Sequence, residues 1–554
     1  MQIIIPMAGS GARFVRAGYN TLKPLIEVDG RPMIEHVVRM FPDEHDFLFV
    51  CARPHLEETP LRSVLESLVP RATIVAIEPH KGGPVYTALA ANDFIKDDEP
   101  VVLNYCDAAA LWDYADFKQR MEQLDCAGSL VAFRGFHPHS LGPTLYAYIR
   151  EQNNTLLEIR EKRAFTDQRM NEYASTGTYY FRSGALLKHY LQRAVERDLQ
   201  THGEYYASVP YNLLVEDGLK VHVYGVQQFT HWGTPEDLAE YRAWSNYFAQ
   251  YPHWKPTMPA LPGINLIPMA GSGTRFSHEG YPQPKPLVPV AGAPMVQRSL
   301  DTFPPAQTWI AACRTEHLQL SALEPVLTGN GHRVQILPVD RPTEGQACTC
   351  LLARPWLDPA APLLIAPCDA ALVYDQEHYA DLTTNPEADC LVWTFRNHPH
   401  ANRHPHQYGW VEATPAGDVR RISCKVPLSD DVRRDPGIIG AFWFRQARFF
   451  LEAADALIAQ NRRVNHEFYV DSAIEVLLEQ GRRAKLFDVQ HYICFGTPDD
   501  VRSYEYWATY FHQAPHHPYT NDRRPEPKAP CGLTADRRGK TPSLAVNGRR
   551  PAVV

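Results

Sequence analysis

The chain has 554 residues, of which 44% are hydrophobic and 21% charged, and its formal net charge is −8 at pH 7. A chain of this length exceeds one hydrophobic core, so we expect roughly two to four domains. The charge balance gives no basic surface for nucleic acid or anionic lipid, and no apolar run approaches the roughly 20 residues that cross a bilayer. We therefore expect neither a nucleic-acid partner nor a membrane partner.

The cysteines and the N-terminal residues indicate the expected cellular compartment. The 11 cysteines are an odd number without paired spacing, and a large chain needs no disulfides for stability, so we interpret them as reduced thiols. A strand-like run begins within three residues of Met1, so the sequence predicts no secretory signal. Both features favour a cytoplasmic location.

The first apolar run, at residues 3–5, leads into a glycine turn, Gly-Ser-Gly, at residues 9–11. Arg13 follows two residues after the second glycine, and Lys23 follows ten residues after Arg13. Glycines at the end of a strand let the backbone turn tightly toward an anionic ligand, and the two cations can neutralise phosphate charge. The combined pattern predicts a phosphate site at the end of the first strand.

This stretch occurs twice. Arg275 stands 262 residues after Arg13, and the same offset joins Lys23 to Lys285. Later in the chain one inserted residue changes the offset to 263, as for the Gly-Thr-Pro motifs at 233–235 and 496–498. A repeat of this length indicates the duplication of a complete domain of about 250 residues.

Strand-like and helix-like patterns alternate within each copy. In the first copy the strand-like runs cover 47–51, 72–77, 101–105 and 129–133, and helical patterns cover 32–41 and 85–94. This alternation predicts an α/β fold: two tandem Rossmann-like domains, each a mostly parallel mixed sheet flanked by helices. Ligands of such sheets bind at the carboxyl ends of the strands, where the glycine turn lies.

Composition changes mark the expected boundaries. A proline-dense segment at 251–262 is typical of a short stiff linker. After residue 514 the chain is rich in Pro, Arg and Gly and loses its apolar periodicity, which predicts disorder. We expect a first copy at 1–248, a linker at 249–262, a second copy at 263–514 and a disordered tail at 515–554.

These motifs resemble those of the sugar-phosphate nucleotidyltransferases, a family of nucleotide-sugar pyrophosphorylase-like enzymes. The family signature, Gly-x-Gly-x-Arg-Phe with Lys-Pro-Leu, Gly-x-Pro-Met and Gly-Thr-Pro-x-Asp, is met at 9–14, 23–25, 30–33 and 233–237, and again at 271–276, 285–287, 292–295 and 496–500. The resemblance covers nearly everything from residue 1 to about residue 510. It implies a GT-A-like fold for each copy.

The resemblance also implies the chemistry. In this family a phosphate oxygen of a sugar phosphate attacks the α-phosphorus of a nucleoside triphosphate and expels pyrophosphate, a reaction that depends on positioning and charge neutralisation. The implied cofactor is Mg²⁺, which prefers carboxylate ligands that bridge to phosphates. The implied catalytic residues are Arg13, Lys23, Arg275 and Lys285. The implied metal ligands are Asp107 and Asp369.

Two further sets follow from the resemblance. The expected nucleotide-binding residues are Ala8, Gly9, Ser10, Gly11 and Gly83 in the first copy, and Ala270, Gly271, Ser272, Gly273, Gly345 and Gln346 in the second. The expected acceptor-binding residues are Lys162, Gly177 and Glu204 in the first copy, and Lys425, Gly440 and Glu467 in the second.

The metal site departs from the family pattern. Many family members place a second metal-binding aspartate two residues before the closing Gly-Thr, where this chain has His231 and Cys494. Neither is a good Mg²⁺ ligand. Asp471 is a candidate substitute in the second copy, but its counterpart in the first copy is Ser208.

The substrate-facing segments also differ between the copies. Lys162 follows a glutamate, as in the family, whereas Lys425 follows Cys424. In the base-facing segment Pro84 has no donor, while the amide of Gln346 can both donate and accept at a base edge. We favour two active copies with different acceptors; a copy that binds nucleotide without turnover is the alternative.

Histidines gather in two proline-containing segments, at 137–139 and 398–406. Four histidines within nine residues of the second segment could bind a transition metal, but the prolines favour a stiff extended loop that need not converge on one ion. We interpret both segments as acceptor-lining or surface loops.

The leading hypothesis is a tandem nucleotidyltransferase that uses a nucleoside triphosphate, with a pyrimidine base favoured, to activate a sugar phosphate or sugar-like phosphate for surface polysaccharide. A cytidylyltransferase for a phosphorylated alditol or aminoalcohol, and a chain in which one copy is a regulatory nucleotide-binding domain, are alternatives. A glycosyltransferase is disfavoured because Asp107 and Asp369 lack the second aspartate of Asp-x-Asp. The base, the acceptor and any homo-oligomer stay open.

Overall fold

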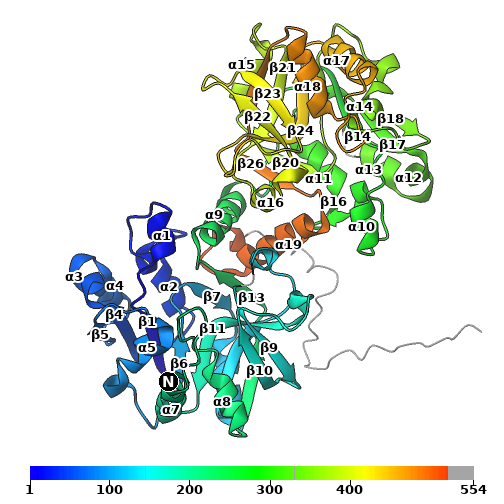
Figure 1. The fold of residues 1–554 in the computed structure, drawn as a ribbon. Helices are drawn as coiled ribbons and strands as arrows, with labels where there is room; N and C mark the ends of the chain where they lie inside the picture. Colours follow the sequence, from blue (N-terminus) through cyan, green and yellow to red (C-terminus); the bar gives the residue numbers. More distant parts are fainter. Residues whose placement is uncertain (144, 330, 522–554) are drawn as a thin grey trace, which may run out of the picture.

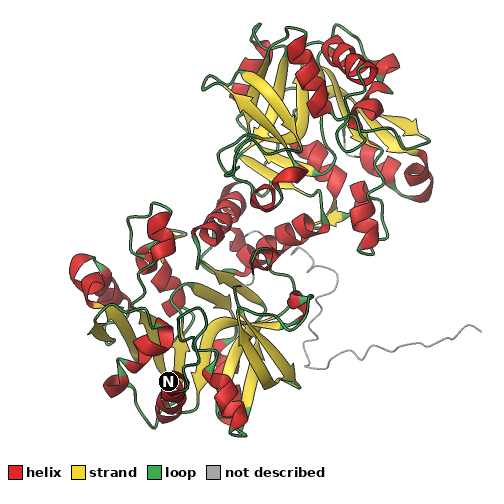
Figure 2. Cartoon of the chain, in the orientation of Figure 1, coloured by secondary structure: helices red, strands yellow, loops and turns green. Residues whose placement is uncertain are grey.

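The computed structural model describes residues 1–143, 145–329 and 331–521. It has two lobes of similar architecture, each with one large sheet between helices (Figures 1 and 2). Residues 522–554 of the expected tail lie outside the described residues.

The first sheet has nine strands with a parallel half and a mixed half. Their order is β5 (Thr73–Ile77), β4 (Phe47–Ala52), β1 (Gln2–Met7), β6 (Val101–Asn104), β11 (Tyr173–Phe181), β8 (Gly128–Phe133), β12 (Val221–Gly225), β10 (Thr155–Glu161) and β9 (Ala147–Gln152). The first four are parallel, while β11 runs antiparallel to both of its main neighbours. Every residue of β1 and β4 is buried, because helices cover both faces.

The second sheet repeats this order. Its main path is β18 (Val334–Val339), β17 (Ala306–Arg314), β14 (Leu261–Met269), β19 (Leu363–Ile365), β24 (Gly437–Phe444), β21 (Cys390–Phe395) and β25 (Ala484–Asp488), with β22 (Gly409–Ala413) and β23 (Val419–Cys424) paired beside it. Each lobe also has a small antiparallel pair, β7 (Ala108–Leu111) with β13 (Gln228–His231) and β20 (Ala370–Val373) with β26 (His491–Cys494). The duplicated α/β fold is therefore confirmed.

The helices follow the same repeat. In the first lobe they are α1 (Ala12–Arg16), α2 (Met33–Val38), α3 (Arg53–Glu58), α4 (Leu61–Leu68), α5 (Gly83–Leu89), α6 (Tyr114–Gln123), α7 (Gly184–Glu196), α8 (Pro210–Glu216) and α9 (Pro235–Gln250). In the second they are α10 (Thr274–His278), α11 (Met295–Thr302), α12 (Thr315–Leu320), α13 (Leu323–Thr328), α14 (Gln346–Leu351), α15 (Gln376–Thr384), α16 (Pro399–Arg403), α17 (Ala447–Ala459), α18 (Val470–Glu479) and α19 (Pro498–Gln513). Within the described chain, no helix combines the length and apolar character needed to cross a bilayer.

The structure differs from the expected boundaries at both ends of the second copy. Strand β14 begins at Leu261, inside the expected linker, and α9 ends at Gln250. The start of the expected disordered tail is folded: residues 518–521 form a short 3₁₀ helix, and His517 is only 2% exposed. His517 Nε2 donates a hydrogen bond to the Ser245 carbonyl of α9, 3.1 Å away, and the Tyr519 ring lies 5.0 Å from that of Phe248, so this segment packs on the first lobe.

Helices α9 and α19 lie between the lobes (Figure 1). The pattern Tyr-x-x-Trp-x-x-Tyr-Phe occupies 241–248 in α9 and 504–511 in α19. Its contacts are reciprocal: the rings of Tyr241 and Trp507 are 5.7 Å apart, and those of Trp244 and Tyr504 are 5.9 Å apart. Such exchange of equivalent contacts is the mark of a two-fold interface, here formed within one chain.

Candidate functional site

The glycine turn is exposed at the end of β1 in the first lobe and of β14 in the second. Gly11 and Gly273 have φ values of 61° and 63°, in the left-handed region that glycine adopts without strain. Each stands immediately before a short helix, whose first N–H groups have no acceptor within the helix. Arg13 and Arg275 are exposed on these helices, and the turns Ala8–Gly11 and Ala270–Gly273 leave backbone N–H groups for phosphate oxygens.

A lysine and an aspartate meet beside each turn. Lys23 Nζ lies 2.5 Å from the Asp107 carboxylate and 3.5 Å from the Gly233 carbonyl. Lys285 Nζ lies 2.5 Å from the Asp369 carboxylate and 3.3 Å from the Gly496 carbonyl. The structure thus brings together the turn, the lysine, the aspartate and the closing motif, which are far apart in sequence, and does so equally in both copies.

Electrostatics keep the first of these aspartates charged. Burial by itself would raise the pKa of Asp107, but Lys23 and His231 outweigh burial and hold that pKa below its usual value. In the second copy burial opposes the charge of Lys285, but Asp369 prevails and the pKa of the lysine is raised. A charged carboxylate at a strand end is a hard oxygen ligand of the kind Mg²⁺ takes together with substrate phosphates. Asp107 and Asp369 therefore fit the implied ion.

The position of the family's second metal ligand carries no oxygen donor. His231 ends β13 and Cys494 ends β26, each hydrogen-bonded in its small sheet opposite the strand that follows the aspartate. Asp471, the candidate substitute, lies on α18 close to Gly409, where an added Cβ would come within 2.2 Å of its Oδ2. Asp471 does not fill the position of the missing second metal ligand, because its charged neighbour is Lys425.

The expected acceptor residues form one network in the first copy. Lys162 donates to the Tyr206 hydroxyl at 2.5 Å, and that hydroxyl donates to the Glu204 carboxylate. In the second copy Lys425 Nζ lies 5.3 Å from the centre of the Tyr469 ring and donates to a backbone carbonyl instead. Both lysines have positive φ, 55° and 63°. Tyr206, two residues after Glu204, links the lysine to the glutamate in the first copy.

The base-facing segment and the acceptor loop are joined by backbone hydrogen bonds. Val85 N–H donates to the Tyr205 carbonyl at 3.2 Å, and Ala347 N–H donates to the Phe468 carbonyl at 3.0 Å. The approach requires glycine: a Cβ on Gly83 would lie 2.9 Å from the Tyr205 carbonyl, and one on Gly345 2.5 Å from the Phe468 backbone. Gln346 follows this contact as the first residue of α14. Gly177 and Gly440 lie on β11 and β24. These strands pair with β9 and β22, which pair in turn with the strands that end just before Lys162 and Lys425.

A buried carboxylate lies near each acceptor lysine, but from different elements. In the first copy it is Glu161 on β10, which accepts a hydrogen bond from Ser208 at 2.6 Å. In the second copy Cys424 replaces the glutamate, and Asp471 replaces the serine. Burial raises the pKa of Glu161 to about 7 and also raises the pKa of Asp471, while the neighbouring lysine opposes both shifts.

The histidine segments are only partly exposed: His404 and His406 are exposed, whereas other histidines of the two segments are buried. His137 and His139 are 0% and 5% exposed, and His400 is 9% exposed. They lie against the interface between the lobes: the ring of His139 is 5.7 Å from that of Trp507 on α19. Residues of α19 in the second copy cover His137 and His139, which explains why this segment is buried.

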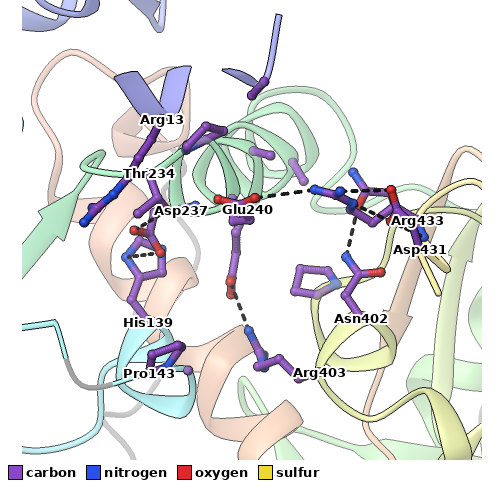
Figure 3. A pocket seen from close by; sticks show the side chains of 18 of the residues that line it. Arg13, His139, Pro143, Thr234, Asp237, Glu240, Asn402, Arg403, Asp431 and Arg433 are labelled. Atoms are coloured by element: carbon purple, nitrogen blue, oxygen red, sulfur yellow. Dashed lines mark hydrogen bonds and ion pairs between the residues drawn. The ribbon is translucent and has the colours of Figure 1, made fainter. Parts of the chain in front are cut away.

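A cavity of about 950 Å³ opens between the lobes. Arg13, Asp237 and His139 line its first-lobe side, and Arg403 and Arg433 line the side of the second lobe (Figure 3). Arg403 pairs with Glu240 and Arg433 with Glu236, both at 3.4 Å. No local motif signals this cavity, because it exists only once the lobes are packed together.

Known proteins resemble each copy. The family model described as "MobA-like NTP transferase domain" matches residues 3–171 and 266–456. The Staphylococcus epidermidis protein named "Bifunctional protein GlmU" is 26% identical over 228 residues, which are 41% of this chain and 48% of that protein. The chain thus spans about half the length of the curated relatives it matches.

Solved structures that resemble the chain cover one lobe each. A nucleoside-diphosphate-sugar pyrophosphorylase from Vibrio cholerae RC9 has 21% identity and a TM-score of 0.36, over 43% of this chain and 99% of that one. The inositol-1-phosphate CTP transferase from T. maritima has 13% identity and a TM-score of 0.35, over 46% and 96%. Since the family model matches both copies over most of the chain, the protein belongs to the MobA-like NTP transferase family, whose domain it carries twice.

Proposed function

We propose that each copy transfers a nucleotidyl group from a nucleoside triphosphate to a sugar phosphate or sugar-like phosphate and releases pyrophosphate. One observation carries this proposal: the Lys23–Asp107 pair beside a glycine turn recurs as Lys285–Asp369 with the same 2.5 Å separation. Two cations and a metal-binding carboxylate at one strand edge suit charge neutralisation on a triphosphate.

The residues of the first copy bind different phosphates of the nucleotide. The exposed turn and Arg13 bind the β- and γ-phosphates, and Lys23 neutralises the α-phosphate at which bonds form and break. When bound, Mg²⁺ on Asp107 neutralises further phosphate charge. Arg275, Lys285 and Asp369 have the same roles in the second copy.

The acceptor binds beside the base-facing segment, whose backbone is hydrogen-bonded to the loop that carries Glu204 or Glu467. Lys162, oriented by Tyr206 and Glu204, is placed to hold the acceptor phosphate. Lys425 takes this role in the second copy, where Glu467 and Gly440 stand at the positions equivalent to Glu204 and Gly177. Because the lysines have different hydrogen-bond partners, we propose different acceptors for the two copies.

The finer assignments are part of the same proposal. A pyrimidine base suits the amide of Gln346, and an activated sugar for surface polysaccharide is the favoured product. A phosphorylated alditol or aminoalcohol with CTP remains the second candidate acceptor class. The ten cysteines in the described part of the chain are free thiols, which supports a reducing, cytoplasmic setting.

The test measures pyrophosphate release from the full chain with Mg²⁺, each nucleoside triphosphate and a panel of sugar, alditol and aminoalcohol phosphates. We expect at least two productive pairs, one lost in Lys23→Ala and the other in Lys285→Ala. Nucleotide binding without pyrophosphate release for any pair would contradict the proposal. Equal rates in both variants and the parent protein would contradict the roles of the lysines.

A further inference from the structure

Three potential metal ligands of the first lobe converge at the edge of the cavity between the lobes. His139 comes from the short 3₁₀ helix Pro138–Leu141, His231 ends β13, and Asp237 lies in the first turn of α9. Their ligand atoms all lie within 4.8 Å of one another. Figure 3 shows His139 and Asp237 facing each other beside Arg13.

The separations suit a single ion. His231 Nδ1 is 3.2 Å from Asp237 Oδ2, and His139 Nδ1 is 3.8 Å from Asp237 Oδ1. Ligands about 2.1 Å from a tetrahedral ion are about 3.4 Å apart, and the observed separations lie on either side of this value.

The buried imidazole of His139 lacks partners for its ring nitrogens. Its side chain is 1% exposed, and within the described chain neither nitrogen makes a hydrogen bond. The nearby Tyr146 hydroxyl is also buried without a hydrogen bond in the described chain. Buried polar groups are normally satisfied, so an unsatisfied histidine aimed at a second histidine and a carboxylate indicates a missing ligand.

The donor atoms indicate the class of ion that this site would hold. Two imidazole nitrogens with one carboxylate oxygen are a donor set for zinc and other first-row transition ions, whereas Mg²⁺ prefers oxygen ligands.

We propose that His139, His231 and Asp237 bind one divalent transition-metal ion of the zinc type. Three protein ligands leave a coordination position open for water or an anionic ligand. His139 and Asp237 both line the cavity, so such a ligand would enter from it. The ion would also fasten β13, the 3₁₀ helix and the start of α9 to one another.

The second lobe satisfies the corresponding groups without an ion. His400 Nδ1 is hydrogen-bonded to the Tyr408 hydroxyl at 2.7 Å, where the first lobe has the unpartnered Tyr146. Cys494 Sγ lies 3.6 Å from the Asp500 carboxylate and accepts from Gly496 N–H at 3.3 Å. The second lobe therefore provides a matched control within the same chain.

The experiment uses the full chain, stripped with a chelator and dialysed against Co²⁺ or Zn²⁺ without nucleotide. We expect one tightly held equivalent per chain, ligand-field absorption for Co²⁺ and a rise in the melting temperature with Zn²⁺. His139→Gln is expected to weaken binding by at least about 100-fold, the upper end of what loss of an outer-shell partner costs. The control His400→Gln is expected to bind as the parent protein does.

His231→Gln gives an independent test. The His231 side chain is 17% exposed, so its replacement is expected to disturb folding less than the replacement of a fully buried residue. It is expected to abolish the Zn²⁺-dependent rise in melting temperature while its circular dichroism matches the parent protein. Either of two outcomes overturns the proposal: no stoichiometric Co²⁺ or Zn²⁺ on the parent protein, or unchanged binding in folded His139→Gln and His231→Gln. Pyrophosphate release plays no part in these measurements, so they stand apart from the proposed transferase activity.

Discussion

The two copies differ in the element that carries a buried carboxyl group near the proposed acceptor lysine. In the first copy the buried carboxylate near the acceptor lysine is Glu161 on β10, and in the second it is Asp471 on α18. At the position of Glu161 the second copy has Cys424, and at the position of Asp471 the first copy has Ser208. The comparison teaches that a buried carboxyl group near the lysine has been kept while the element that carries it has changed, which fits the proposal of different acceptors for the two copies.

The interface shows a second difference. Tyr506 of α19 fills a space in the first lobe, with its ring 5.0 Å from that of His137, and hydrogen-bonds with the Phe229 backbone. Its counterpart in α9 is Ala243, and there a cavity of about 100 Å³ lies against Phe395 and Tyr492. The reciprocal aromatic core is thus symmetric, but its margins are not.

The largest expected effect is a loss of stability when the reciprocal aromatic core between α9 and α19 is changed. Trp507 is fully buried between the lobes, so Trp507→Ala is expected to lower the free energy of unfolding by about 3–5 kcal/mol. Trp244→Ala, at the equivalent but partly exposed position, is expected to cost less. Denaturant unfolding of both variants measures the difference, and equal losses would show that the two sides contribute equally.

The next effect separates the active sites. Lys23→Ala and Lys285→Ala are each expected to lower kcat at their own site by about 10²–10³-fold, the loss typical of removing one group that stabilises transition-state charge. The activity of the other copy is expected to persist, and assays with the preferred substrates of each copy check this. Loss of both activities in either variant would show that the copies do not act independently.

A pH effect tests the buried carboxylate of the first copy. The pKa of Glu161 is about 7 in the fold and 4.5 when unperturbed, so the folded state binds more protons between these values. Stability is therefore expected to fall as pH rises from about 4.5 to 7, by up to about 3 kcal/mol. Glu161→Gln is expected to remove this fall, which melting temperatures at pH 5 and pH 8 measure. An unchanged pH dependence in the variant would mean that Glu161 ionises normally.

The smallest effect is expected at the rim of the cavity. Arg433 and Glu236 form an ion pair at 3.4 Å with side chains 50% and 66% exposed. An exposed pair of this kind contributes roughly 0–1 kcal/mol, so Arg433→Ala is expected to leave the melting temperature almost unchanged. Arg403→Ala serves for comparison and is expected to lower the melting temperature more, because the Arg403 side chain is only 23% exposed and pairs with Glu240. A large effect of Arg433→Ala alone would indicate that Arg433 has a role beyond its ion pair.

The sequence predicted the features that repeat in register. The common offset of Lys23 with Lys285 and of Asp107 with Asp369 indicated equivalent sites, and the strand-helix alternation indicated the fold. The constant 2.5 Å pairs were not foreseen, because the lysine and aspartate are separated by 84 positions and only the closed sheet brings them together.

The sequence could not predict features that depend on packing between distant parts. Asp471 was considered as a metal ligand because nothing local shows that α18 turns it toward Lys425 and Gly409. His139 was taken for part of an exposed or acceptor-lining loop because its cover, α19, lies more than 350 residues further on. The aromatic repeat at 241–248 and 504–511 was a visible signal of the interface, since apolar rings on the outer face of a helix call for a partner.

The two-fold packing of α9 on α19 has a consequence for how the copies can change. In a dimer of identical chains any substitution occurs in both subunits, so an interface residue must suit both sides at once. Here one polypeptide encodes both sides, and Tyr506 could arise opposite an unchanged Ala243. Covalent linkage also holds the halves at a high effective concentration, so association does not depend on the amount of protein. Joining the halves in one chain therefore allows the sequence of each copy to diverge independently of the other.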